Sequence, residues 1–318
     1  MMSSRYALAL GVSVLAGGLV ALQARINGEF GLALNNVPLA AFLSFFSALM
    51  LLTAILLFRK KAQWGVAGLW SSIRSGELPW WIAIGGVGGA FHVLAQGYSA
   101  GILGVALFTI AAVTGQTLGS LVIDTLGWFG AMRVRLTLWR VLGGLVVLAG
   151  VVTSFDTDLG PLVLEPTLLL VPFLAGMGNS FKQAANGRVR NFSGSLLSAV
   201  FVNFAVGTAV LAVLFAISLP LVDLPTTWPS SWWLWSGGAL AAGIIAIQVS
   251  TVSIVGVMGL GVSLVTGQLM GSLLIDALAP LSTSHQNFSI ILGALATLAG
   301  SALVALTRKP SPPAPNEK

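Results

Sequence analysis

Residues 113–126 of this chain read VTGQTLGSLVIDTL, and residues 265–278 read VTGQLMGSLLIDAL, identical at ten of fourteen positions. The two stretches lie 152 residues apart. Related spacings recur outward from them, at Trp80-Trp81 with Trp232-Trp233, Gly104 with Gly256, Asn27-Gly28 with Asn186-Gly187, and LGGLVVLAG (142–150) with LGALATLAG (292–300). The chain is therefore two copies of one unit, and we place the division near residue 160.

The composition is that of a membrane protein. Of the 318 residues, 56% are hydrophobic and 8% are charged, and the mean hydropathy is +0.95. Soluble globular domains are much less apolar, so most of the chain has to face lipid or other apolar helices. With no cysteine and two histidines, disulfides, thiolate chemistry and a histidine-rich metal site are excluded, and no cofactor is expected.

The apolar segments have the length of membrane-spanning helices, which need about 20 mostly apolar residues. Barrel strands would be shorter, with alternating polarity. The predicted spans are residues 6–24, 38–58, 79–99, 102–123, 136–154, 167–184, 194–218, 232–252, 255–276 and 288–306. We therefore predict an all-α membrane protein with ten transmembrane helices in the lipid bilayer.

The cations predict the orientation, because lysine and arginine are retained on the cytoplasmic side. If the N-terminus is inside, the inner connections carry Arg59, Lys60, Lys61, Arg74, Arg133, Arg135, Arg188 and Arg190, with Arg140 just inside the next span. The pI of about 10.3 thus indicates membrane orientation and not nucleic-acid binding. We predict a multi-pass protein of the inner membrane with both termini in the cytoplasm.

Each predicted repeat has five spans, an odd number, so the second repeat enters the membrane from the opposite side. Transporters with such inverted repeats place the substrate site near the midplane, at the repeat interface, and alternate access by rocking one half against the other. The predicted units are residues 1–160 and 161–307. A tail with four prolines, residues 308–318, is predicted to be disordered in the cytoplasm.

The repeated GQ…GSL.ID element, with Gln23 and Asn27 at the end of the first span, resembles the drug/metabolite transporter superfamily. Its members here are Gly115, Gln116 and Asp124, and again Gly267, Gln268 and Asp276. Within that superfamily the chain looks like the YdcZ-type inner-membrane exporters, in a fused two-copy form. The resemblance implies export, through a pathway lined by the first, third and fourth helices of each half, with the fifth helix peripheral. Lys182 stands where Gln23 stands in the first half, so the halves need not contribute equally.

Polar side chains inside a bilayer are costly and are usually paired or functional. Gln116, Ser120 and Asp124 follow each other at i, i+4 steps on one helix face, and Gln268, Ser272 and Asp276 repeat the pattern. We expect this stripe to line a cavity; the alternative is that it only holds neighbouring helices together. The predicted substrate-binding residues are Gln23, Asn27, His92, Gln96, Thr114, Gln116, Asn179, Lys182, Gln183, Gln248, Thr266 and Gln268.

Two further hypotheses concern a histidine and the charged groups near the span ends. His92 either binds substrate and exchanges a proton, or is a neutral side chain bonded to its neighbours. The predicted gating residues are Arg25 with Asp276 as an outer latch, and Lys182 with Asp124 as an inner latch. The alternative is that all four are interfacial charges, whose exposed pairs contribute about 0–1 kcal/mol.

The leading function hypothesis is a secondary transporter of a small solute, because the chain contains no P-loop of the GxxxxGK[ST] type. A channel or facilitator, and a flippase for lipid-linked substrates, stay open as alternatives, as does a homodimer. An intramembrane enzyme lacks an HExxH motif and a cysteine nucleophile, so we expect no enzyme activity. A cavity lined by amides, without a midplane carboxylate, favours neutral or zwitterionic metabolites.

Overall fold

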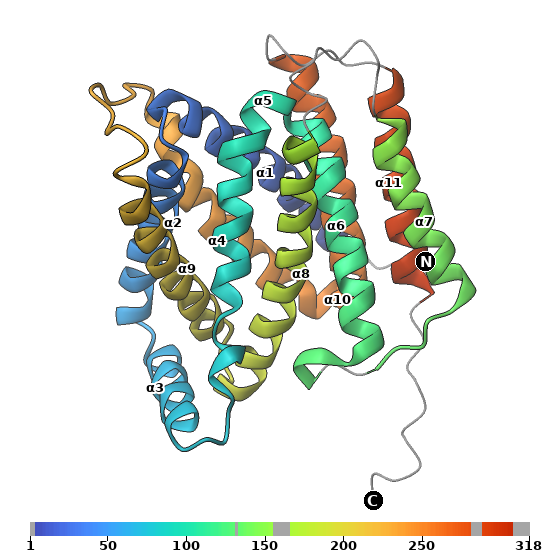
Figure 1. Cartoon of the computed structure of the whole chain (residues 1–318). Helices are drawn as coiled ribbons and strands as arrows, with labels where there is room; N and C mark the ends of the chain where they lie inside the picture. Colours follow the sequence, from blue (N-terminus) through green and yellow to red (C-terminus); the bar gives the residue numbers. More distant parts are fainter. Residues whose placement is uncertain (1–3, 131–132, 155–165, 281–287, 308–318) are drawn as a thin grey trace, which may run out of the picture.

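The computed structural model describes residues 4–130, 133–154, 166–280 and 288–307. Its regular elements are helices, arranged as a bundle (Figure 1). In chain order they are α1 (Ser4–Leu34), α2 (Val37–Leu57), α3 (Lys60–Arg74), η1 (Trp80–Ile82), α4 (Gly85–Ala95), η2 (Gln96–Ala100), α5 (Gly101–Leu103), α6 (Val105–Leu126), η3 (Trp128–Gly130), α7 (Leu138–Thr153), α8 (Pro166–Ser193), α9 (Leu196–Ser218), η4 (Trp232–Ser236), α10 (Gly237–Leu278) and α11 (Phe288–Leu306).

Seven helical segments of the described chain are long and apolar enough to cross a membrane. They are α1, α2, α6, α9, Trp232–Val252, Met258–Leu278 and α11, while α7 is apolar but shorter. The number is below the predicted ten because the third predicted span is divided among α4, η2 and α5, and because α8 carries polar residues such as Asn179 and Lys182. The all-helical class is confirmed, and the ten-span count stays a prediction.

Two glycines interrupt the helices at equivalent points of the repeat. Gly104 (φ 82°, ψ 161°) separates α5 from α6, and Gly256 (φ 73°, ψ 169°) divides α10 into two segments. Glycine adopts a positive φ at little cost because it has no Cβ. The repeated sequence therefore shares a backbone conformation, and the second segment of α10 begins at Val257 as α6 begins at Val105.

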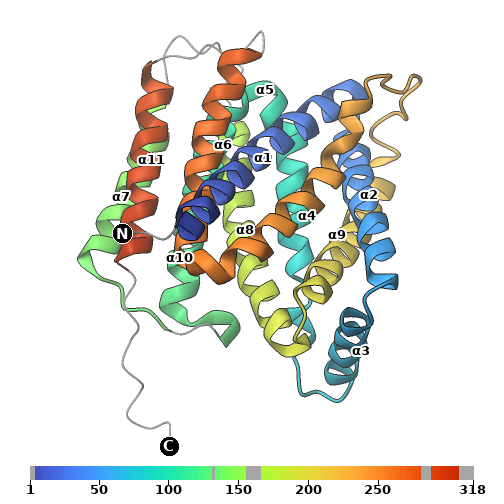
Figure 2. The same ribbon diagram turned by 180° about the vertical axis from the view of Figure 1, so that it is seen from behind.

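The halves of the chain pack crosswise through glycines. A Cβ added to Gly115 would overlap the backbone carbonyl of Phe173, and one added to Gly267 would overlap that of Val14. Hence α6 lies directly on α8, and α10 lies on α1, which crosses it in Figure 2. Gly115 and Gly267 are 152 residues apart, so equivalent contacts use equivalent residues. Such close backbone approach stabilises helix pairs in membranes.

The helices α7 and α11, which end the two predicted repeats, lie side by side at one edge of the bundle (Figures 1 and 2). Glycines again allow the contact: a Cβ on Gly143 would come within 2.8 Å of the carbonyl oxygen of Gly300. Both helices also contact α6. The inward faces of α7 and α11 therefore pack against the bundle through α6.

The sequence prediction places the 15 residues of α3 in a cationic connection, whereas the structure has a helix there. It buries Ala62, Gly65 and Leu69 and contacts α8 and α9, and the Ser198 hydroxyl donates a hydrogen bond to the carbonyl of Ala62 at 2.9 Å. Its other face is exposed, including Trp64. A short amphipathic helix with basic and tryptophan side chains is typical of a membrane surface.

Candidate functional site: a cavity between the two halves

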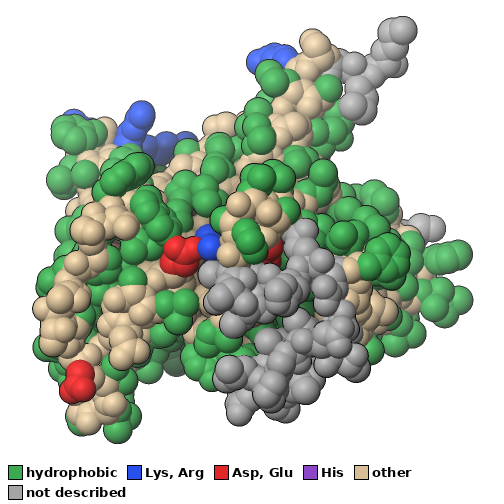
Figure 3. Space-filling view, turned by 90° about the horizontal axis from the view of Figure 1, so that it is seen from above, with side chains coloured by type: hydrophobic (Ala, Val, Ile, Leu, Met, Phe, Trp, Pro, Cys, Tyr) green, Lys and Arg blue, Asp and Glu red, His purple; other side chains and the backbone are tan. Residues whose placement is uncertain are grey.

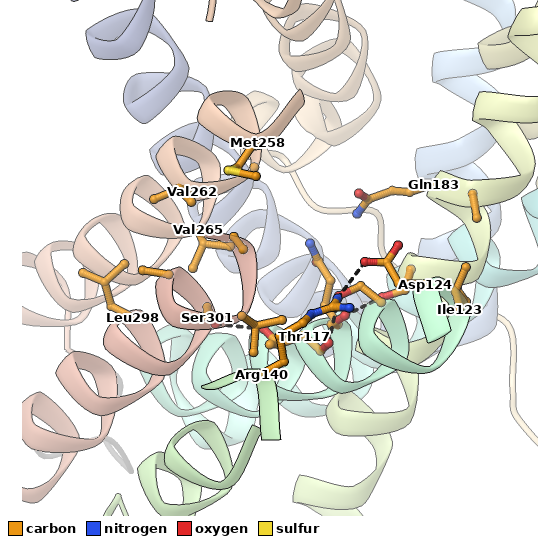
Figure 4. A pocket seen from close by; sticks show the side chains of 18 residues that line it. Thr117, Ile123, Asp124, Arg140, Gln183, Met258, Val262, Val265, Leu298 and Ser301 are labelled. Carbon is orange, nitrogen blue, oxygen red and sulfur yellow. Dashed lines mark hydrogen bonds and ion pairs between the residues drawn. The ribbon is translucent and has the colours of Figure 1, made fainter. Parts of the chain in front are cut away.

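A cavity of about 330 Å³ lies where α6 and α11 finish and α7 begins. Side chains from α6, α7, α8, α11 and the second segment of α10 line it (Figure 4). Its size falls at the lower end of the range for small-molecule sites. The resemblance implied a peripheral fifth helix in each half, but α7 and α11 line this cavity because both pack against α6.

The predicted polar stripe on α6 faces this cavity, which Gln116, Ser120 and Asp124 all line. The Asn179 amide donates to the Gln116 Oε1 at 2.9 Å, and the Ser180 hydroxyl donates to the Gln116 carbonyl at 2.6 Å. These contacts join α6 to α8, so the stripe both lines the cavity and bonds neighbouring helices. Both functions proposed for it from the sequence are therefore compatible with its position.

Arg140 is the cationic residue of the cavity wall. Its backbone N–H lies in the first turn of α7 and donates to the Thr137 side chain, which caps the helix. The side chain is 1% exposed, and Nη2 donates to the Asp124 Oδ2 at 2.7 Å. Nε and Nη1 have no hydrogen-bond partner among the described residues. Sequence reasoning treated Arg140 only as an orientation signal, although an arginine within an apolar span is itself a signal of function.

A second group of predicted residues lies deeper in the bundle, away from the larger cavity. His92, Gln96 and Gln268 border a space of only about 10 Å³. The Asn27 amide donates to the Gln96 Oε1 at 2.7 Å, and Ser44 donates to the Asn27 Oδ1 at 3.0 Å. Asn27 and Gln96 are buried, so this network joins α1, α2 and the π turn η2.

The remaining predicted binding residues lie outside the larger cavity, apart from Gln183, which lines it. The Gln23 amide donates to the Gly237 carbonyl at 2.9 Å, and Thr114 donates to the Val147 carbonyl at 3.2 Å. The Thr266 hydroxyl bonds within its own helix. Gln248 is half-buried in the first segment of α10. The Lys182 side chain passes α4 near Gly89, where a Cβ would be 3.2 Å from its Cδ.

The ion pairs in this structure differ from the predicted latches, which stay a prediction. Arg25 pairs with Glu29, one turn further along α1, and not with Asp276. Asp124 pairs with Arg140 from α7, and not with Lys182. The predicted pairs join residues of different halves, whereas the observed partners are closer along the chain. Glu29 lies four positions after Arg25 on the same helix, and Arg140 lies at the start of the helix that follows Asp124.

Asp276 binds the end of a helix. Its Oδ1 accepts from the Val105 N–H at 3.0 Å, and its Oδ2 accepts from the Ala106 N–H at 2.7 Å. The first N–H groups of a helix lack partners within the helix and attract a carboxylate. Gly104 has no side chain to cap α6 itself. The buried carboxylate therefore joins the C-terminal part of α10 to the start of α6, at the end of α6 opposite the cavity.

The repeat places Asp124 at the position equivalent to Asp276, 152 residues earlier, and Met258 at the position equivalent to Ala106. Asp124 and Met258 both line the cavity (Figure 4). Thus Asp276 bonds a helix N-terminus at one end of the bundle, while the equivalent Asp124 at the other end bonds Arg140 and has a cavity beside it. The two equivalent carboxylates therefore have different partners, backbone N–H groups for Asp276 and a guanidinium for Asp124.

These features describe a helical protein with a repeat, with segments long and apolar enough to cross a membrane, and with a cavity that has polar and apolar walls. The family described as "Putative inner membrane exporter, YdcZ" matches residues 8–153 and again residues 167–303. The chain therefore belongs to the YdcZ family, in a fused two-copy form.

Two other comparisons concern curated proteins and solved structures. A search of curated proteins found no significant match. A solved structure described only as "Crystal structure of protein" aligns with a TM-score of 0.51 and 19% identity, over 96% of this chain and 98% of that one. At that identity the likeness shows the fold alone.

Replacing Gln116 by alanine is expected to lower transport by the purified, reconstituted protein and to change its melting temperature little. The cavity admits water, which replaces the lost amide as partner of Asn179, so the expected cost is within about 1 kcal/mol. Gln268→Ala is the matched variant from the other half. Failure of both variants to fold would show that the stripe serves packing, and normal transport by both would show that transport does not need it.

Proposed function

We propose that the chain is a secondary transporter that exports a small solute across the inner membrane by alternating access between two inverted five-helix repeats. The repeats are residues 1–160 and 161–307, with ten spans and both termini in the cytoplasm. The family match over both halves supports the two units. The crosswise glycine contacts support their equivalence, because they follow the spacing of the repeat.

The charge distribution supports the proposed orientation. The connections that carry Arg59 and Arg133, and the C-terminal part of α8, which carries Arg188, lie at the end of the bundle where α6 finishes beside the cavity (Figure 1). The opposite face, viewed from above in Figure 3, shows a few Lys, Arg, Asp and Glu side chains among hydrophobic and uncharged ones. Cations are retained in the cytoplasm, so the cavity faces the cytoplasm and the end closed by Asp276 faces outward.

The observation that carries the proposal is the difference between the equivalent carboxylates. Asp276 bonds the N–H groups of Val105 and Ala106, whereas Asp124 borders a cavity. In the opposite state, Asp124 would bond the N–H groups of Val257 and Met258, and Asp276 would release α6. A hydrogen bond to a charged group contributes about 1.5–3 kcal/mol, which is enough to bias states that differ by a few kcal/mol.

A pair of single cysteines tests this arrangement, because the native chain has none. Val262 lines the cavity, and Ile110, the equivalent residue 152 positions earlier, is 0% exposed. We expect a membrane-impermeant maleimide to label Val262→Cys from the cytoplasmic face of inside-out vesicles. Ile110→Cys should resist labelling from either face.

Each other labelling pattern has a defined meaning. Labelling of Val262→Cys from the outside alone would reverse the proposed orientation. Simultaneous labelling of Val262→Cys from inside and Ile110→Cys from outside, at equal rates, would indicate an open pore and favour the channel.

A further inference from the structure

The cavity contains a buried guanidinium with unused hydrogen-bond donors. Arg140 is 1% exposed, and of its three guanidinium nitrogens only Nη2 bonds Asp124. Nε and Nη1 have no partner among the described residues. The arginine charge persists at any physiological pH, and buried donors without partners are destabilising. Both nitrogens are also buried from solvent, so another acceptor of hydrogen bonds reaches them only if the guanidinium turns away from Asp124.

The groups around Arg140 suit a small solute with one polar end. Thr117 and Ser301 share a hydrogen bond of 2.8 Å beside it. On the other side of the cavity lie the apolar side chains of Val262 and Leu298 (Figure 4). A solute lying across the cavity would place an anionic group on Arg140 and an apolar body against these side chains.

We propose that Arg140 is the anion-binding residue of the cavity and that the transported solute carries a single carboxylate. The inference rests on the proposed function and names its substrate class. Arginine binds carboxylates and phosphates by parallel N–H donors. The site holds one cation and already one carboxylate, Asp124, so it suits a singly charged carboxylate better than a phosphate dianion. Of the neutral or zwitterionic metabolites expected from the sequence, the proposal keeps the zwitterions that carry a single carboxylate.

Binding would be an exchange of partners. The solute carboxylate accepts hydrogen bonds from Arg140 in place of Asp124, and the guanidinium stays charged throughout. Asp124 is then released toward Met258 on the other side of the same cavity. No covalent bond changes, and the number of charges on the protein is constant.

Matched small probes test the carboxylate. We would measure the melting temperature of the detergent-purified protein with isobutyrate, with isobutyramide, which has the same shape without charge, and with inorganic phosphate, all at equal ionic strength. A ligand that binds the folded state raises its apparent stability. We expect isobutyrate to raise the melting temperature and isobutyramide and phosphate to leave it unchanged. An equal effect of 2-aminoisobutyrate would show that the site binds the carboxylate also when the solute carries an ammonium group.

Variants connect the effect to the residue. Arg140→Gln should weaken isobutyrate binding about tenfold or more, as loss of a charged partner does, whereas Arg135→Gln, at an exposed arginine, should not. The double variant Arg140→Met/Asp124→Asn removes both charges, leaves no unpaired ion and should also fail to bind. A third measurement needs no change at Arg140: isobutyrate, but not isobutyramide, should protect Val262→Cys from maleimide.

The inference is overturned if isobutyrate and isobutyramide act alike, if phosphate alone stabilises the protein, or if the isobutyrate effect survives both Arg140 variants. Its failure is distinguishable from failure of the proposed function. One-sided labelling of Val262→Cys without a carboxylate effect would overturn only the inference. Suppose instead that isobutyrate raises the melting temperature only when Arg140 is present, and that Val262→Cys and Ile110→Cys are labelled from both sides as in an open pore. That result would support the anion site and overturn the proposed transporter function.

Discussion

Asn in place of Asp276 is expected to expose Ile110→Cys to labelling from the outside. The Asp276 carboxylate bonds two N–H groups at the start of α6, and an asparagine keeps one acceptor oxygen and no charge. Hydrogen bonds to a charged group contribute about 1.5–3 kcal/mol. Their loss should raise the fraction open to the outside about tenfold or more, since each 1.4 kcal/mol is a factor of ten.

The control is Asp124→Asn, the same change at the equivalent position of the other half. It leaves the Asp276 contact intact, so Ile110→Cys should stay protected from the outside. The labelling rate of Ile110→Cys in vesicles of known orientation measures both variants. If Ile110→Cys is labelled no faster in the Asp276→Asn protein than in the protein with native Asp276, the carboxylate does not hold the outer end closed.

Alanine in place of Gly115 or Gly267 is expected to lower the melting temperature and the yield of folded protein severely. The added Cβ of each would overlap a backbone carbonyl, of Phe173 or of Val14. A backbone group cannot rotate away as a side chain can, so the helices must separate. Overpacking commonly costs about 1–3 kcal/mol and occasionally more, and a clash with backbone belongs at the upper end.

Gly11→Ala provides the comparison within α1, because an added Cβ there meets nothing within 4 Å. Alanine favours helix over glycine by about 1 kcal/mol, so this variant should melt at the same temperature or higher. Thermal unfolding followed by circular dichroism in detergent measures all three. Equal melting of Gly115→Ala and Gly11→Ala would show that the close contact of α6 with α8 does not hold the bundle together.

Sequence reasoning predicted the all-helical class and the two-copy family, and both are confirmed. Apolar runs locate helices because lipid excludes unsatisfied backbone groups, and the duplicated element locates the halves. The same reasoning missed α3, because an amphipathic helix at a surface has neither the length nor the apolarity of a span. It also missed the π turn η2, where Gly31 packs against the backbone of Gly97. Such a contact between distant segments leaves no periodic pattern.

For the candidate site, the polar stripe on α6 was predictable from its i, i+4 spacing, and the partners of the charged residues were not. Asp276 was expected to meet a cation, yet it bonds backbone N–H groups, which every residue except proline carries and which the sequence therefore does not distinguish. The orientation rule explains Arg140 as a cation on the cytoplasmic side, and so gives no reason to expect it in a binding site. Only the fold shows that it is buried beside Asp124.

Arg140 has no equivalent in the second half. The matching sequences at 142–150 and 292–300 place Ile290 at its position, and Ile290 is buried among apolar residues. On the proposed cycle, a perfectly symmetric pair of carboxylates would leave the empty molecule divided equally between its two states. Arg140 gives Asp124 a competing partner at one end only, so the unloaded protein rests with its cavity toward the cytoplasm. A preference of about 1.4 kcal/mol would hold ten molecules in that state for each one in the other, which makes the cytoplasm the side of loading.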